Sequence, residues 1–92
     1  MWFVYVLECS DGSYYTGMTS NLKERMNRHS ERRGSFHTSL RLPVRLKYYE
    51  EFKDRAEAER REIEIKKLSI KNKNRLIQWG NGKRFPSPLN AG

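Results

Sequence analysis

Polar side chains occupy core-facing positions on a predicted helix that begins at Asn21. Counting i+3, i+4 and i+7 from Leu22 gives Arg25, Met26 and His29. A helix buries side chains at this spacing, so an arginine and a histidine stand where apolar residues are usual. A guanidinium suits phosphate oxygens, and an imidazole exchanges protons near neutral pH. The alternative is that both side chains reach solvent from the edge of the stripe.

A carboxylate holds a similar place on the next long predicted helix. Glu62 lies four residues after Ala58 and three before Ile65, and these two residues define the buried side. A buried carboxylate costs free energy unless it is paired, hydrogen-bonded or bound to a metal. Glu62 is therefore either a ligand for a divalent cation or the ion-pair partner of Arg25 or Arg61.

Two tyrosines lie on the two strands of a predicted hairpin. A three-residue loop over 10–12, with Gly12 in the left-handed conformation, pairs Leu7 with Tyr15 and places Tyr5 on the same face. A two-residue turn would separate the tyrosines. We expect the three-residue loop, and the alternative role for both side chains is ordinary aromatic core.

The elements that must position these residues follow the order ββαβαα. Strands are predicted over 2–8, 13–18 and 44–52, and helices over about 21–33, 54–68 and 69–80, with Gly34 as a left-handed helix end. Residues 35–43 are predicted to be a loop. This pattern predicts an α/β (α+β) fold with a small three-stranded antiparallel sheet packed by helices. Residues 1–80 form one domain, and residues 81–92 a flexible C-terminal tail.

Length and composition narrow the classes of protein. The 92 residues are 36% hydrophobic and 33% charged, which suits one compact domain. The longest apolar run, residues 2–7, is far below the roughly 18 residues of a membrane helix and lacks the flanks of a signal peptide. We therefore expect no membrane partner and a cytoplasmic location. The single cysteine, Cys9, excludes an internal disulfide and, with two histidines, does not favour a zinc site.

The charge points to a polyanionic partner. Nineteen Lys and Arg against eleven Asp and Glu give +8, and nucleic acid is the commonest partner of such a field. Residues 20–49 carry +6, residues 50–64 carry −3 and residues 65–92 carry +7. An acidic segment between two basic ones suits metal-assisted chemistry on phosphate, although a solvated helix of mixed charge has the same composition.

In this order and spacing, the residues resemble the GIY-YIG nuclease domain, most closely its small stand-alone bacterial members. The resemblance covers residues 2–78. Two positions depart from the motif in ways that leave its chemistry intact, since Phe3 replaces its first glycine and Thr16 its central isoleucine. Met18 stands where excision-repair relatives carry a lysine. The matching segments are Phe3-Val4-Tyr5, Tyr15-Thr16-Gly17, Arg25 with His29, and Glu62.

The resemblance implies hydrolysis of phosphodiester bonds in DNA with one divalent metal, Mg²⁺ or Mn²⁺, held by Glu62. It also implies that Arg25 binds the phosphate, and that Tyr5, or next Tyr15, aligns or deprotonates the attacking water. His29 would relay that proton or bind phosphate. Two weaker candidates complete the set: His37, and an asparagine that follows the glutamate in family members, Asn74 or Asn72.

Basic side chains would hold DNA by its phosphates: Lys23, Arg28, Arg32, Arg33, Arg41, Arg45 and Lys47. We expect no second DNA-binding domain within these 92 residues. Selectivity would then come from branched, nicked or damaged DNA, as in repair or recombination, or from a partner protein; no small-molecule substrate is implied. The alternatives are a non-catalytic nucleic-acid-binding module and an RNA-binding domain of unrelated fold, which would leave Glu62 unexplained.

Overall fold

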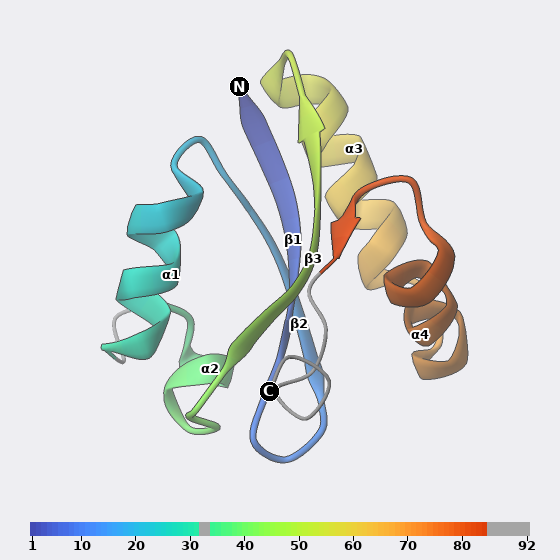
Figure 1. Ribbon diagram of the computed structural model, residues 1–92. Helices are drawn as coiled ribbons and strands as arrows, with labels where there is room; N and C mark the ends of the chain where they lie inside the picture. The colour runs from blue at the N-terminus through green and yellow to red at the C-terminus, as the bar shows by residue number, and fades with distance from the viewer. Residues whose placement is uncertain (32–33, 85–92) are drawn as a thin grey trace.

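A computed structural model describes residues 1–31 and 34–84 of the chain (Figure 1). Its sheet has four antiparallel strands in the order β2-β1-β3-β4, with β1 in the interior. No helix in the described ranges is long and apolar enough to cross a membrane. The elements in chain order are β1 (Trp2–Glu8), β2 (Tyr14–Thr19), α1 (Leu22–Ser30), α2 (Phe36–Ser39), β3 (Arg45–Phe52), α3 (Arg55–Lys66), α4 (Ile70–Trp79) and β4 (Lys83–Arg84).

The sheet separates two layers of helices. In Figure 1, α1 and α2 lie on one side of the strands, and α3 and α4 lie on the other. Successive side chains of a strand point to opposite faces, and on β1 this sends Val4 and Val6 into a core shared with Ala58 and Ile65 of α3. Tyr5 and Leu7 point to the other face. One face of the sheet therefore supplies the apolar core, and the other faces α1 and α2.

The hairpin has the predicted three-residue loop. Gly12 has a φ of 84° and donates its N–H to the carbonyl of Cys9, at 3.0 Å. Leu7 lies opposite Tyr15, and Tyr5 lies opposite Gly17. The prediction that Tyr5 and Tyr15 share one face of the sheet is confirmed.

The three predicted helix starts are confirmed by their caps. The Asn21 side chain accepts the N–H of Glu24 at 3.1 Å, which satisfies one of the free donors of the first turn. Asp54 and Ser69 do the same for α3 and α4.

The segment after α1 differs from its prediction. The helix ends at Ser30 with Glu31 as its C-cap, so Gly34 lies too far along the chain to be the predicted helix end. The glycine is needed for space, because a Cβ there would lie 2.1 Å from Nδ1 of His29. The predicted loop over 35–43 contains α2, which begins with a capping box between Ser35 and Thr38. A helix of four residues is too short to be recognised from a periodic pattern in the sequence.

The predicted three-stranded sheet is also wrong, since β4 adds a fourth strand and the order becomes ββααβααβ. β4 lies in the segment 81–92 that the sequence assigns to a tail; residues 85–92 are outside the described ranges.

The hydroxyl of Tyr48 on β3 links the sheet to the segment before β4. It accepts the N–H of Gly82 at 2.8 Å and donates to Glu50 at 2.6 Å. Arg61 donates two hydrogen bonds to the same carboxylate. Burial is the main reason why the pKa of Tyr48 is raised to about 12.

Gly17→Ala tests the close approach of Tyr5 to β2. A Cβ at position 17 would lie 2.4 Å from the Tyr5 hydroxyl oxygen, and Tyr5 is only 1% exposed, so its ring cannot swing into solvent. We expect a loss of about 1–3 kcal/mol in the free energy of unfolding, measured with urea. Gly12→Asn, in open space at a φ that asparagine tolerates, is the control. Wild-type stability in Gly17→Ala would contradict this packing.

Candidate active site

A buried hydrogen bond joins β1 to α1 on the face opposite the apolar core. The Tyr5 hydroxyl and Nε2 of His29 are 3.0 Å apart. Tyr5 is 1% exposed and His29 is fully buried. A buried hydroxyl and a buried imidazole are each costly without a partner, so each satisfies the other.

α2 supplies the second partner of the histidine. Nδ1 of His29 lies 2.8 Å from the Thr38 hydroxyl, which is also fully buried. Both ring nitrogens of His29 are therefore occupied, one by Tyr5 and one by Thr38. This leaves no ring nitrogen to bind a phosphate directly, which disfavours one of the two roles expected for His29.

Tyr15 and His37 extend this cluster toward the surface, since both are half-buried. The ring centroid of Tyr15 lies 5.4 Å from that of His29 and 6.4 Å from that of Tyr5. The His37 ring stacks on Tyr15 at 6.0 Å, and its Nε2 lies 3.1 Å from the Ser13 hydroxyl. The structure therefore brings His37 to the other predicted residues.

Burial keeps the central pair neutral at neutral pH. It is the main reason why the pKa of Tyr5 is raised above 10.0, with Tyr15 and Glu62 adding to the increase and Arg25 opposing it. Burial also lowers the pKa of His29 below 6.5, and the charge of Arg25 lowers it further. These interactions place Arg25 and Glu62 within electrostatic range of the Tyr5 hydroxyl.

Arg25 is half-buried on α1. Among the described residues, no hydrogen bond or ion pair joins its guanidinium to another side chain. A partly buried arginine usually has an acceptor for its donors, and Arg25 lacks one among the described residues. Its five N–H groups are therefore available to an anion that enters the site.

Glu62 pairs with neither arginine considered for it. Its carboxylate is 17% exposed and lies 3.7 Å from the ammonium of Lys66, which is 52% exposed. Arg61 binds Glu50 instead, at 2.8 Å. Because the ammonium of Lys66 is half exposed, it can move into solvent and leave the carboxylate to a cation.

The donors at this site suit a hard divalent cation. Within residues 1–31 and 34–84, no group of three or more His, Cys, Asp and Glu side chains could enclose a metal. Mg²⁺ keeps several waters and needs only one or two carboxylates, together with phosphate oxygens. Glu62 fits such a site, whereas zinc would need more protein ligands.

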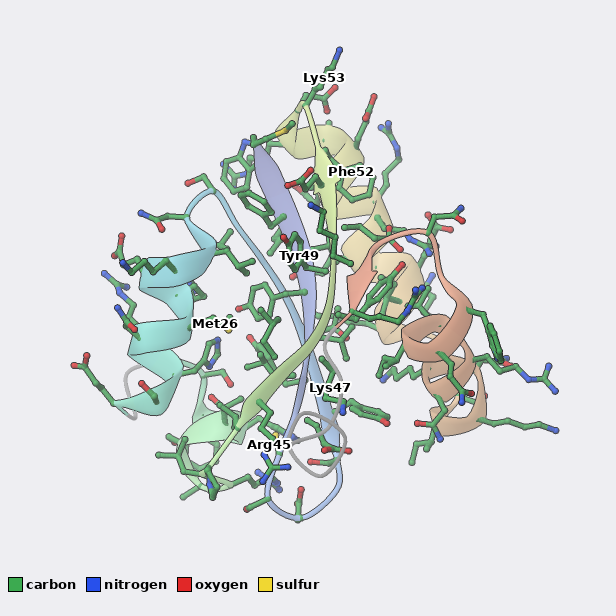
Figure 2. The ribbon with its side chains drawn as sticks, in the orientation of Figure 1. Met26, Arg45, Lys47, Tyr49, Phe52 and Lys53 are labelled. Carbon is green, nitrogen blue, oxygen red and sulfur yellow. The ribbon has the colours of Figure 1, made fainter. Side chains whose placement is uncertain are left out.

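The other predicted residues lie outside the cluster. Asn74 is on α4, where its side-chain oxygen accepts from the Tyr14 hydroxyl, and the backbone N–H of Asn72 belongs to the Ser69 cap. Arg32 and Arg33 are outside the described residues. Of the remaining predicted DNA contacts, Lys23 and Arg45 are exposed and Lys47 is half-buried; Arg28 pairs with Glu24 at 3.3 Å and Arg41 with Asp11 at 2.9 Å. Figure 2 shows Arg45 and Lys47 on the half of β3 away from Phe52 and Lys53.

Comparison with known proteins decides the family. Residues 1–75 match the GIY-YIG catalytic domain. The chain belongs to the GIY-YIG family.

The relatives of this GIY-YIG protein are of similar length. A UPF0213 protein of Desulfotalea psychrophila is 45% identical over 84% of this chain and 71% of its own length. A UPF0213 protein of Halobacterium salinarum is 46% identical over 84% of this chain and its own whole length. The solution NMR structure of the UPF0213 protein BH0048 from Bacillus halodurans has a TM-score of 0.57, with 40% identity and 88% of each chain covered. The family implies a nuclease-type function, and these relatives' names state no substrate.

Sequence reasoning missed two residues of this GIY-YIG site, Thr38 and Ser13. Thr38 follows Ser35 at the spacing of a capping box, but a threonine at the third helical position is a weaker signal than a glutamate. Ser13 follows the hairpin glycine, and its hydroxyl donates to Asp11 at 2.6 Å. This hydrogen bond is the main reason why the pKa of Asp11 is lowered to about 2.

The lowered pKa of His29 predicts how stability depends on pH. The unfolded chain takes up a proton near pH 6.5 more readily than the folded protein does. The free energy of unfolding should therefore fall as pH is lowered through 6.5 toward the folded-state pKa. We expect His29→Gln to flatten this slope in urea unfolding between about pH 5 and 7. The control His37→Gln, which leaves His29 in place, should retain the slope; a slope unchanged in His29→Gln would refute the assignment.

Proposed function

We propose that this protein is a metal-dependent endonuclease that hydrolyses phosphodiester bonds in DNA. The observation that carries the proposal is the half-buried guanidinium of Arg25, which has no partner among the described residues and lies beside the Tyr5–His29 pair. A phosphodiester repels nucleophiles, so its hydrolysis depends on neutralising charge and on positioning. A guanidinium fork can bind two phosphate oxygens at once.

Tyr15 is the tyrosine that an attacking water can reach. It is half-buried, whereas Tyr5 is 1% exposed. This burial favours Tyr15 over Tyr5 for aligning and deprotonating the water. The water oxygen forms a bond to phosphorus while its proton passes to the Tyr15 oxygen, and the tyrosine releases its own proton to solvent. The ester P–O bond then breaks, and the leaving oxygen takes a proton from solvent.

Glu62 would hold Mg²⁺ or Mn²⁺. When bound, the ion supplies positive charge that stabilises the leaving oxygen. The ammonium of Lys66, which is half exposed, can leave the carboxylate for solvent. Arg25 and Glu62 both act electrostatically on the Tyr5 hydroxyl, which supports a common site for the phosphate-binding and metal-binding groups.

The DNA would be held along α1 and β3 by its phosphates. The net charge of +8 supports this, as do the exposed cations of Lys23 and Arg45. Phosphate contacts position a duplex without reading its sequence. We therefore propose that selectivity comes from branched, nicked or damaged DNA, in repair or recombination, or from a partner protein.

A non-catalytic nucleic-acid-binding module is the second candidate, and one observation favours it. Glu62 has Lys66 as an ion-pair partner, so its place on the buried side of α3 does not require a metal. Such a module would bind the same nucleic acid and leave it uncut.

Glu62→Gln separates these two functions. The amide keeps the size of the side chain but removes the charge that a metal needs. We expect Mg²⁺-dependent cleavage of nicked, flapped or branched DNA to be lost, with DNA binding retained. Thermal unfolding should be nearly unchanged, because the variant loses one ion pair whose ammonium is half exposed and keeps the size and polarity of the side chain. Glu59→Gln, an exposed carboxylate of the same helix, is the control. Full cleavage by Glu62→Gln would exclude Glu62 as the metal ligand.

Arg45→Gln tests the surface that holds DNA. Each phosphate contact changes the logarithm of the binding constant by about 0.9 per tenfold change in salt. The variant should reduce this slope by about 0.9 for every duplex sequence. Lys53 lies at the other end of β3 in Figure 2, so Lys53→Gln should leave the slope unchanged. A loss of affinity confined to one DNA sequence would contradict the phosphate assignment.

A further inference from the structure

The short helix α2 is held in place by three contacts with the β1–β2 hairpin. The Arg41 guanidinium, just beyond α2, binds Asp11 at 2.9 Å, and the carbonyl of Arg41 accepts the N–H of Ser10 at 2.9 Å. Within α2, His37 contacts the Ser13 hydroxyl at 3.1 Å. These contacts fix the position of Thr38 relative to the strands that carry the tyrosines.

The Thr38 hydroxyl has one hydrogen to donate and two lone pairs to accept with. The backbone N–H of Ser35 lies 3.3 Å from its oxygen and can only donate to it. The Ser35 carbonyl, at 3.2 Å, can only accept the hydroxyl hydrogen. The Ser35 hydroxyl, 3.1 Å from the Thr38 oxygen, accepts the N–H of Thr38 and can turn its own hydrogen to solvent. When it does so, one lone pair of Thr38 remains for Nδ1 of His29, at 2.8 Å. In this arrangement Nδ1 carries a proton and donates it to Thr38.

The neutral imidazole carries one N–H, so the proton on Nδ1 leaves Nε2 as an acceptor. The Tyr5 hydroxyl must then donate to Nε2 across the 3.0 Å contact. The hydrogen of Tyr5 points toward His29, and the lone pairs of its oxygen point away from it. The groups that act on this oxygen from elsewhere include Arg25, Tyr15 and Glu62.

We infer that Thr38 is a positioning residue for the site: through Nδ1 of His29, it fixes the tautomer that makes Tyr5 present its lone pairs to Arg25 and Tyr15. This inference rests on the proposed nuclease function only for its effect on cleavage. The reverse tautomer would have Nε2 donating to Tyr5, and the Tyr5 hydrogen would then point toward the guanidinium. That orientation opposes the positive charge of Arg25, so the hydroxyl of Thr38 decides the sign of the dipole at the centre of the site.

The tautomer is measured directly in the wild-type protein. Two-dimensional ¹H–¹⁵N NMR that detects long-range couplings in the imidazole distinguishes a protonated nitrogen from a bare one. At a pH where the ring is neutral, we expect His29 to carry its proton on Nδ1 and to have a bare Nε2. A proton on Nε2 overturns the inference. Because this measurement needs no catalysis, it stays decisive even if the protein cleaves no DNA.

Thr38→Val tests the consequence for cleavage. Valine has nearly the shape of threonine but offers Nδ1 no acceptor, so the proton should move to Nε2. We expect the turnover number for Mg²⁺-dependent DNA cleavage to fall about 10–100-fold, the size of the effect known for metal-ligating histidines that lose their orienting partner. The KM for DNA should stay unchanged, because Thr38 is fully buried and touches no phosphate.

Two further variants separate positioning from simple loss of packing. Thr38→Ser keeps the hydroxyl and should retain the Nδ1 proton and most of the turnover. Ser39→Ala, which removes a neighbouring hydroxyl of α2 that donates to the Phe36 carbonyl of the same helix, should behave as wild type. A folded Thr38→Val with wild-type turnover overturns the inference, whereas a wild type that cuts no DNA overturns the proposed function. If Thr38→Val does not fold, the wild-type tautomer and the Thr38→Ser variant still decide.

Discussion

The site depends on a hydrogen bond between two buried polar groups, the Tyr5 hydroxyl and the His29 imidazole, which lie 24 residues apart in the chain. Neither group would be buried without the other, because an unpartnered buried polar group costs about 1–3 kcal/mol. Two glycines leave room for the pair: a Cβ at Gly17 would meet the tyrosine, and one at Gly34 would meet the histidine. Thr38 then satisfies the last ring nitrogen. The hairpin, α1 and α2 are thus arranged around one polar contact.

Apolar burial on the opposite face of the sheet offsets the cost of burying these polar groups in a small domain. Val4, Val6 and Ile65 are fully buried there, as is Ala58, and they remove apolar surface from water without any polar cost. The Tyr48 hydroxyl extends that layer to the C-terminal segment through Gly82. Since apolar burial on one face does not depend on the tyrosine–histidine pair, substitutions in the polar cluster can alter chemistry while the core holds the strands in register.

The parts that the sequence could predict are those set by local rules. Gly12 determines the hairpin register, and that register alone places both tyrosines on one face. Helical spacing identified His29 as inward-facing, and it is fully buried. The parts that failed depend on contacts between distant segments. α2 and β4 are too short for periodicity, and contacts with distant segments hold them in place. The ion-pair partner of Glu62 is Lys66 rather than an arginine, a choice that side-chain geometry makes and spacing does not.

The electrostatics of the cluster also explain how it can be both stable and ready to react. The same Arg25 charge lowers the pKa of Tyr5 and of His29, so it favours a tyrosinate but opposes an imidazolium. Burial outweighs the first effect and adds to the second, and both groups therefore rest in their neutral forms. A phosphate bound to Arg25 would offset its charge and remove both influences together. The protonation of the buried pair is then coupled to occupancy of the site by an anion, through a single side chain that, among the described residues, has no other partner.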